Sequence, residues 1–586
     1  MNDENLTENK STDEQNPAAQ PKEESTLAKA PNSVGSGVIP YGGPTSLYAQ
    51  KLQKKESRLK IIINNAKGLK APIVFVALLF TSILAANIVI TSGFGSLLMP
   101  VCVPILYVIF YFWKGVKSEF FSAESIILLV FVFLLCSGFI LNNDSLTNTV
   151  TMLTLVVLIP IQLSMSTQNE TLDDFSIVKR TAKAFTSDTF SIFPKAFKTF
   201  TANKEDSGKS SKIKYILIGI ACTIPFLIVL ISLFANGDDM FRSSLGKIDR
   251  LLFENTDALT VIFSVILGAI AALYLFPLFI RLKYSEMDAD EEVRRHRGLN
   301  AIAVTTFLII LILLELTFSF IQVKYLFLNM GVLAEGETYA QYARSGFFEI
   351  SAATILTIAI IFVTSQFTQK KEDGRLPLVI KILLTVFSLC VCLMFASSYY
   401  RMFMYISAYS LTVKRVAVCW LMALMLLVLA GILIKLWAKG FKLMQYVVYT
   451  VLVSVLALNV LSVESFVAKY NVDKYLDEKN TGFILDIDYL GTLTPASLPQ
   501  IKRIADKGPY RSAHNYNVAL EKLITAKNLY ETNDFKWQGA NVQLYRAKKT
   551  VEETDYANMP DIDVSKYFIK DYSENDVSYE DGWTGI

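Results

Sequence analysis

Histidine and charge are scarce in this sequence. Its 586 residues include two histidines, His296 and His514, and only 19% of the residues are charged. The two histidines lie in different parts of the chain, so a multi-histidine zinc or haem site is not expected, and we predict no metal site and no cofactor. The 56 Lys and Arg residues exceed the 53 Asp and Glu residues by three, and this small surplus indicates no nucleic-acid partner.

Cysteine is also rare, and its positions exclude a disulfide framework. All six cysteines lie inside apolar runs of the sequence. In such surroundings a cysteine is a small buried apolar side chain. This interpretation applies to Cys102, Cys136, Cys222, Cys390, Cys392 and Cys419.

Enzyme signatures are lacking as well. The stretch "SGKSS" at 207–211 resembles the end of a phosphate-binding loop, but Asn203 stands where that loop needs its first glycine. The sequence contains no HExxH and no GxSxG motif. We therefore predict no catalytic residues, and we leave enzymatic activity open while favouring its absence.

Apolar residues, in contrast, make up 52% of the chain, and the mean hydropathy is +0.39. A helix that crosses the hydrocarbon layer of a membrane needs about 20 mainly apolar residues. We therefore predict an all-α polytopic transmembrane helix bundle of about eleven spans in a lipid bilayer. The predicted spans are 71–91, 95–113, 123–141, 147–165, 214–235, 258–280, 299–325, 347–368, 377–397, 415–437 and 443–463.

The distribution of Lys and Arg predicts the orientation of these spans. The flank before the first span is basic, and so are the loops that alternation places on the same side, including "KGVKSEF", "QKKEDGR" and "KLWAKGFK". The opposite loop "NNDS" has no Lys or Arg. We predict a multi-pass protein of the cell membrane, with the N-terminus inside and the region from about residue 464 outside.

The chain divides into five predicted regions. Residues 1–50 lack an apolar pattern and are expected to be a disordered cytoplasmic tail. A basic juxtamembrane segment (51–70) and the transmembrane domain (71–463) follow, then an extracytoplasmic helical domain (464–555) and an acidic, aromatic tail (556–586).

The outer domain contains two helical patterns. In "TPASLPQIKRIADKG", Pro499 stands near the expected helix start. In "SAHNYNVALEKLITAKNLYE", five residues can share an apolar side: Tyr516, Leu520, Leu523, Ile524 and Leu529.

The long cytoplasmic loop at 166–213 has four phenylalanines at helical spacing, Phe190, Phe193, Phe197 and Phe200. They fit a helix that lies in the inner headgroup layer of the membrane. They fit equally a helix that packs on the transmembrane bundle.

Glu315 is the acid that lies deepest within a predicted span. An intramembrane carboxylate can bind a proton or a cation, or it can fix the packing of helices as a neutral or paired group. Both interpretations are open. Three amides within spans, Asn87, Gln322 and Asn459, are expected to form hydrogen bonds between helices.

Two polar and aromatic stretches are predicted at the outer face. The first is "YAQYARSGFFEI" at 339–350, and the second is "SSYYRMFMYISAYSLTVKR" at 397–415. In the second, Arg401, Tyr405, Tyr409 and Thr412 have the spacing of one helical side. Arg401, Lys414 and Arg415 oppose the positive-inside tendency, so a local partner is expected. The candidate binding cluster comprises Tyr339, Tyr342, Arg344, Glu349, Arg401, Tyr405, Tyr409 and Arg415.

The ligand of this cluster is open among an anionic ligand, a lipid headgroup and an envelope protein. Structural anchoring by an interfacial aromatic belt is the alternative.

At these stretches the sequence resembles the bacterial multispan membrane family DUF4173, which is related to the DUF4153 proteins. The resemblance rests on "FIQVKYLF", "YAQYARSGFFEI", "YRMFMYISAYSLTVKR", "ESFVAKYN" and "LDIDYLGTLTPASLP", and it covers roughly residues 210–500. The chain differs from the family after Tyr409, where Ser410 stands in place of a common glycine. The resemblance implies the architecture and no reaction.

Three functions are compatible with these features. The first is an envelope-associated sensor, scaffold or assembly factor, which the outer domain favours. The second is a transporter or carrier of an anionic or lipid-like molecule. The third is a membrane-embedded enzyme that acts on an envelope lipid or glycan, with Glu349, Asp486 or Asp488 as its acid or base. The two aspartates fit helix caps at least as well.

Overall fold

The computed structural model describes residues 59–68, 70–92, 97–115, 122–168, 172, 176–200, 230, 234, 258–284, 298–327, 347–369, 375–480, 482–493, 495–532 and 539–556. These residues are mainly helical and include no strand, only an isolated bridge between Leu299 and Thr368. The prediction of an all-α bundle is confirmed. The N-terminal tail, the C-terminal tail after Tyr556 and, apart from two isolated positions, the predicted span 214–235 lie outside the described residues.

Nine helices in the described ranges are long and apolar enough to cross a membrane, and each matches a predicted span. They are α2 (Lys70–Ser92), α4 (Ala123–Leu141), α5 (Ser145–Gln168), α11 (Ala258–Lys283), α12 (Ala301–Phe327), α14 (Phe347–Phe367), α15 (Leu378–Tyr409), α16 (Val413–Trp437) and α17 (Leu443–Leu461).

Two predicted spans differ from the structure in length. The span predicted at 95–113 is a shorter apolar segment, formed by the π-helix η1 (Leu98–Cys102) and α3 (Val103–Lys114). Pro100 and Pro104 fall in this segment, where a proline lacks the backbone N–H that a regular helix needs. The span predicted at 377–397 is shorter than α15, which has 32 residues from Leu378 to Tyr409.

The first bundle consists of α2, α3, α4, α5, α11 and α17, which share one apolar core. Phe110, Trp113 and Phe276 are almost fully buried in it. At the crossing of α11 and α2, a Cβ atom on Gly268 would lie 2.5 Å from Ile83 Cα. Glycine at this position therefore lets the two helices approach closely.

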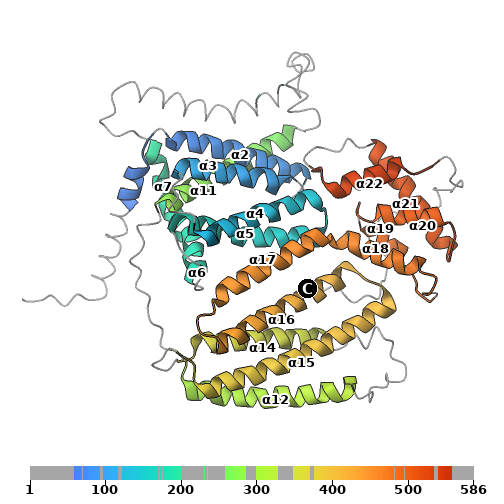
Figure 1. The fold of residues 1–586 in the computed structure, drawn as a ribbon. Coiled ribbons are helices and arrows are strands. Elements are labelled where there is room, and N and C mark those ends of the chain that lie inside the picture. Colours follow the sequence, from blue (N-terminus) through green and yellow to red (C-terminus); the bar gives the residue numbers. More distant parts are fainter. Residues whose placement is uncertain are drawn as a thin grey trace, which may run out of the picture. The chain divides into compact units, whose positions relative to one another are not determined.

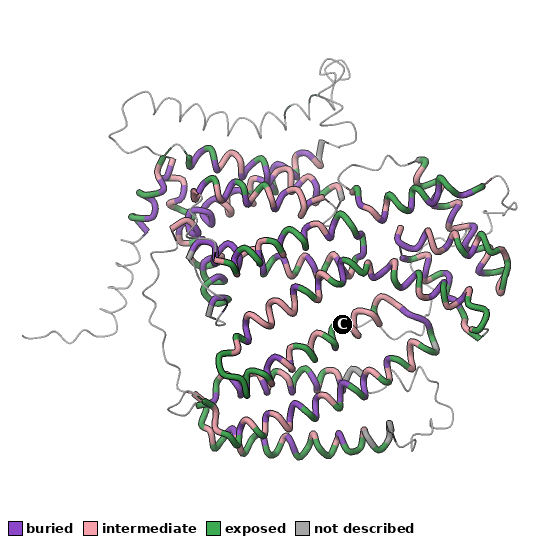
Figure 2. Tube along the Cα trace, in the orientation of Figure 1, coloured by how far each residue is buried: buried purple, intermediate pink, exposed green. Residues whose placement is uncertain are grey.

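The second bundle consists of α12, α14, α15 and α16. Helix α15 packs against each of the other helices, as Figure 1 shows for this part of the chain. Leu384, Phe387 and Val391 of α15 are buried in the shared core. Helix α12 exposes Ile302 (78%) and Phe320 (71%), and exposed positions recur along these helices in Figure 2. Exposed apolar side chains of this kind are expected to face lipid.

The C-terminal domain comprises α18 (Val463–Leu476), α19 (Ile487–Thr492), α20 (Leu498–Lys507), α21 (Ala513–Thr532) and α22 (Val542–Glu552). Its core contains Val467, Ile501 and Leu523. As predicted, Pro499 lies at the start of α20, and Leu520 and Leu523 are buried. Leu529 is 49% exposed, so its predicted place on the apolar side of α21 is wrong.

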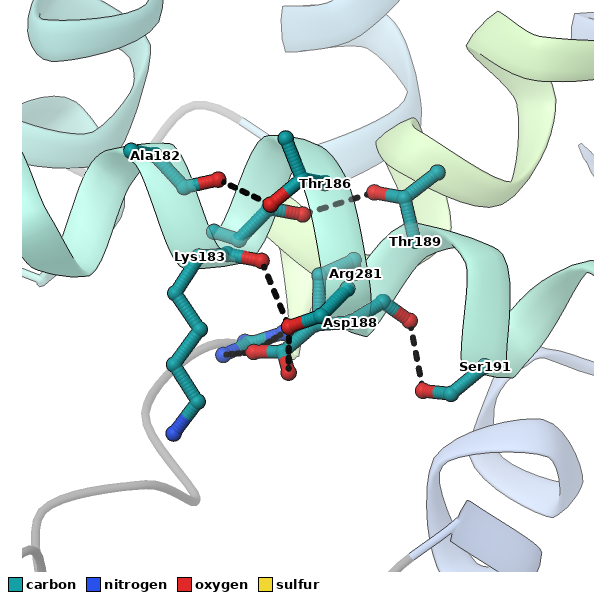
Figure 3. Close-up of polar contacts among 9 residues, drawn as sticks. Ala182, Lys183, Thr186, Asp188, Thr189, Ser191 and Arg281 are labelled. Atoms are coloured by element: carbon teal, nitrogen blue, oxygen red, sulfur yellow. Dashed lines mark hydrogen bonds and ion pairs between the residues drawn. The ribbon is translucent and has the colours of Figure 1, made fainter.

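The described part of the 166–213 loop begins with α6 (Ser176–Lys183), the π-helix η3 (Ala184–Asp188) and α7 (Thr189–Ala196). Asp188, at the end of η3, accepts hydrogen bonds from Arg281 Nε at 3.2 Å and Nη2 at 2.9 Å (Figure 3). Phe197 and Phe200 pack on Phe276 of α11. The segment therefore packs on the bundle.

The first two of its four phenylalanines remain accessible. Phe190 is 65% exposed and Phe193 is 39% exposed. A contact of these two rings with the headgroup layer stays a prediction.

Polar contacts at one end of the first bundle join segments that are predicted to be cytoplasmic. Lys114 Nζ donates to Ser166 O at 2.8 Å, and Lys283 Nζ donates to Trp113 O at 2.9 Å. Lys442 Nζ lies 3.7 Å from Glu124 Oε1. The described flanks of these predicted cytoplasmic loops therefore lie at the same end of the bundle. Which side of the membrane this end faces stays a prediction.

Candidate functional site

A buried pair of acids joins the C-terminal domain to the opposite end of the first bundle. Asp144 lies in the short connection between α4 and α5, and Glu464 lies in the first turn of α18. Asp144 is fully buried, and Glu464 is 8% exposed. Two charged residue types that are rarely buried thus lie close together where two parts of the molecule meet.

Each acid accepts a backbone hydrogen bond from the start of a helix in the other segment. Asp144, which precedes α5, accepts from α18, and Glu464 of α18 accepts from α5. Glu464 N donates to Asp144 Oδ2 at 3.2 Å, and Ser145 N donates to Glu464 Oε1 at 3.4 Å. The first N–H groups of a helix have no acceptor within the helix, so a side-chain oxygen there is stabilising. The helices α5 and α18 therefore exchange their caps.

Gln543 connects α22 to the same pair. Its Nε2 lies 2.6 Å from Asp144 Oδ1 and 2.6 Å from Ser462 Oγ, and its Oε1 accepts from Asn143 N at 2.7 Å. We call Asp144, Glu464 and Gln543 the acidic joint. It fixes two helices of the C-terminal domain, α18 and α22, to the α4–α5 connection.

The electrostatics of the acidic joint favour bound protons. Burial, and then the nearby charge of Asp144, raise the pKa of Glu464 to about 7. Burial also raises the pKa of Asp144, although the hydrogen bonds from Gln543 and from the backbone of α18 oppose that shift. Glu464 Oε2 is buried and has no hydrogen-bond partner among the described residues. A proton on this oxygen would remove the cost of an unpaired buried charge.

Two asparagines support the acidic joint from the membrane side. Asn142 Nδ2 donates to the carbonyl of Asn459, and Asn459 Nδ2 donates to Thr151 Oγ1 at 2.8 Å. A Cβ atom on Gly138 of α4 would collide with the side chain of Asn459. The interhelical hydrogen bond that the sequence predicted for Asn459 is therefore confirmed, and Gly138 makes room for it.

The other two predicted amide contacts are also confirmed. Asn87 Nδ2 of α2 donates to Ser264 Oγ of α11 at 3.5 Å. Gln322 Oε1 of α12 accepts from Ser397 Oγ of α15 at 2.9 Å.

Only part of the predicted outer-face cluster lies among the residues that the structure describes. Tyr339, Tyr342 and Arg344 lie outside the described residues. For Glu349 the description covers only the backbone, in the first turn of α14. The convergence of "YAQYARSGFFEI" with the second stretch therefore stays a prediction.

The corner between α15 and α16 holds the other aromatic residues of the cluster. Arg415 Cζ lies 3.9 Å from the centre of the Tyr405 ring, and the rings of Tyr405 and Tyr409 are 5.4 Å apart. Arg415 Nη1 donates to the carbonyls of Tyr409, at 3.2 Å, and Ser410. Arginine at the C-terminal end of a helix satisfies free carbonyls and the negative end of the dipole. This contact is the local partner expected for Arg415.

The prediction that Thr412 continues the helical side of Arg401 is wrong. Helix α15 ends at Tyr409, and Thr412 is the N-cap of α16, where its Oγ1 accepts from Arg415 N at 3.4 Å. Because Ser410 has φ 76° and ψ 171°, the chain turns away from the helix before Thr412.

Arg401 and Glu315 have partners on neighbouring helices of the second bundle. Arg401 Nη2 donates to Gln322 Oε1 of α12 at 3.4 Å. Glu315 Oε1 accepts from Thr357 Oγ1 of α14 at 2.8 Å. Both residues therefore contribute to interhelical contacts.

Other residues considered from the sequence have ordinary structural positions. Asp486 is the N-cap of α19 and accepts from Tyr489 N at 2.9 Å, which confirms its interpretation as a cap. His514 is exposed on α21. Cys102, Cys136 and Cys390 are buried free thiols, whereas Cys392 and Cys419 are partly exposed. Within the described ranges, no group of His, Cys, Asp and Glu could hold a metal ion.

Sequence reasoning missed the acidic joint. Two signals were present: Asp144 is the acid of the short "NNDS" loop, and Glu464 opens the "ESFVAKYN" stretch directly after a span. An acid next to a helix start indicates a cap. Neither signal indicates that the two caps are exchanged.

The spanning helices and their helical C-terminal domain define a multi-pass integral membrane protein. The family model described as "Domain of unknown function (DUF4153)" matches residues 126–504, more than half of the chain. The chain belongs to the DUF4153 family. This match supports the relation to DUF4153, whereas membership of DUF4173 stays a prediction. No curated protein and no solved structure matches the chain.

Proposed function

We propose that the protein is a non-enzymatic sensor, scaffold or assembly factor of the bacterial cell envelope. In this proposal it resides in the cell membrane, and its C-terminal domain docks on the outer end of the spanning helices and contacts a partner there. The acidic joint carries the proposal, because it adds a buried polar attachment to the apolar contacts between that domain and the spanning helices.

A polar attachment is suited to a domain that changes its position or its partner. Burying two carboxylates costs desolvation energy, so such a joint contributes less to stability than an apolar interface of the same size. Its hydrogen bonds instead favour one arrangement of α5, α18 and α22. The apolar core of the domain continues into Leu458 of α17 and contacts Leu146 of α5 and Trp420 of α16. A change that breaks the hydrogen bonds would therefore loosen α18 and α22 at the α4–α5 connection while these apolar contacts remain.

The partner surface that we propose lies on the exposed side of the C-terminal domain. Ile484 is 87% exposed, and Tyr545 of α22 is 69% exposed. Exposed apolar and aromatic side chains are common at protein contact sites. We favour an envelope protein over an anion as the ligand. The arginine that an anion would need at the corner between α15 and α16, Arg415, already contacts two carbonyls and the Tyr405 ring.

Site-specific photo-crosslinking in living cells tests this proposal. A photoreactive residue at Ile484 or Tyr545 should give one discrete protein adduct. The matched control is Ile302, which is 78% exposed on the spanning helix α12 and should give lipid adducts only. The partner proposal fails if neither outer position gives a protein adduct while Ile302 shows that the chemistry works.

A transporter of an anionic or lipid-like molecule is the alternative. Glu315 favours it, because an acid within a spanning helix is a common element of proton-coupled transport. Proton-driven flux of an anion into proteoliposomes, lost in Glu315→Gln, would support transport. A membrane-embedded enzyme ranks third, since Asp486, one of its candidate groups, caps α19.

A further inference from the structure

Helix α12 carries a line of polar residues within the second bundle. Glu315, Ser319 and Gln322 are separated by four and then three residues, so they lie on one side of the helix. Seven residues of α-helix rise by about 10 Å. The line therefore runs from within the predicted membrane layer toward the end of α12 at which Gln322 bonds to Ser397 and Arg401.

Two oxygens in this line are buried without a hydrogen-bond partner among the described residues. They are Glu315 Oε2 and Ser319 Oγ, and Ser319 as a whole is 3% exposed. The thiol of Cys390 on α15 lies beside both residues. A thiol is only a weak hydrogen-bonding group.

The surroundings of Glu315 do not fit a charged carboxylate. Its Oε1 has one hydroxyl donor, Thr357, and in the described part of the chain no Lys or Arg forms an ion pair with it. An ionised carboxylate in the hydrocarbon layer needs a cationic partner or several donors. A neutral acid needs neither, and it can place its proton on Oε2.

We propose that Glu315 is an exchangeable proton-binding site within the membrane domain. The carboxylate takes a proton from water to form the acid and returns it to water, with no other reactant. Thr357 Oγ1 lies 2.8 Å from Oε1 and 2.9 Å from the carbonyl of Ala353, and its one proton can serve only one of them. The acid can therefore carry its proton on Oε1, donating to Thr357, or on Oε2. A sodium ion would need several oxygen ligands, whereas this carboxylate has one hydroxyl partner. The site shares no residue with the acidic joint, so either proposal can fail alone.

Dicyclohexylcarbodiimide labelling tests the site on the wild-type protein. This apolar reagent reacts with protonated carboxyl groups in the lipid layer. Full-length protein in liposomes is treated over a pH series from mildly acidic to alkaline, and the adducts are located by mass spectrometry. We expect an adduct on Glu315 that decreases as the pH rises.

Glu124 is the internal control, because it has polar partners. Its Oε2 accepts from Leu172 N at 2.9 Å, and its Oε1 lies 3.7 Å from Lys442 Nζ. We expect little labelling of Glu124 at any pH. Glu315→Gln should lose only the Glu315 adduct, and Thr357→Val, which keeps the acid, should retain it.

Three outcomes would overturn the proposal. The first is no Glu315 adduct at any pH, and the second is an adduct whose yield does not change with pH. The third is protection of Glu315 by sodium at constant pH, which would identify a sodium ion as the ligand. Since these outcomes are read on the wild-type chain, poor folding of a variant does not affect them.

Discussion

Glu464 is the residue whose protonation most directly makes the stability of the structure depend on pH. Its pKa is raised from 4.5 to about 7 by burial and by Asp144. Between these two values the docked state keeps a proton that an exposed Glu464 has lost. Separation of the C-terminal domain from the bundle, or unfolding, then releases a proton, so rising pH favours the separated or unfolded state. The stabilising contribution is complete below pH 4.5 and is lost as the pH rises to about 7.

Glu464→Gln should therefore flatten the dependence of stability on pH. Glutamine keeps the Oε1 acceptor for Ser145 N and resembles the protonated acid. In the wild type we expect stability to fall by up to about 3 kcal/mol across this range, and in the variant by much less. Thermal unfolding of the detergent-solubilised protein at a series of pH values measures both slopes.

A control for this prediction is Glu478→Gln, because Glu478 is exposed at the end of α18. It should keep the wild-type slope. Asp144 also has a raised pKa, so a small slope is expected to remain in Glu464→Gln. An unchanged slope in Glu464→Gln would show that Glu464 does not titrate in this range.

Residues of the site differ in how far sequence can predict them. Amides within spans were predictable, because a buried amide needs a partner and the partners are neighbouring helices. Asn87, Gln322 and Asn459 follow this rule. Asp144 and Glu464 do not, because 320 residues separate them and their contact depends on how α5 and α18 meet.

At the scale of elements, periodicity predicts a helix more reliably than it predicts the helix end. The spacing of Arg401, Tyr405 and Tyr409 is helical in the structure, but the same spacing wrongly included Thr412. The end of α15 is determined by Ser410, whose φ of 76° and ψ of 171° lie in a region that almost only glycine adopts. The serine itself gives no such signal, whereas the glycine that is common at this position in the resembling family does.

Ser410→Gly should stabilise the corner between α15 and α16. Removing Cβ relieves backbone strain worth about 1 kcal/mol or more, while the carbonyl that accepts from Arg415 is kept. We expect a higher Tm in detergent. Ser410→Ala is the matched control, because it removes the hydroxyl but keeps Cβ. If alanine stabilises as much as glycine, the gain does not come from the backbone conformation.

At the scale of the whole molecule, composition and apolar runs were sufficient for the fold class. The length of a spanning helix is set by the membrane, so the matches from α2 to α17 follow from physical necessity. The division into two bundles could not be predicted. It depends on which apolar faces pack together, and lipid-facing and helix-facing side chains in a membrane are equally apolar.

The orientation of the bundle gives the last prediction. The acidic joint lies at one end of α4 and α5, and Lys114 and Lys442 lie at the other. In the proposed cell membrane, one of these ends faces the cytoplasm. The positive-inside rule assigns the basic end to it. In a variant without native cysteines, Glu478→Cys should react with a membrane-impermeant maleimide in intact cells. Lys439→Cys, which is also exposed, should react only after permeabilisation. The reverse pattern would invert the topology and place the C-terminal domain, with any partner, in the cytoplasm.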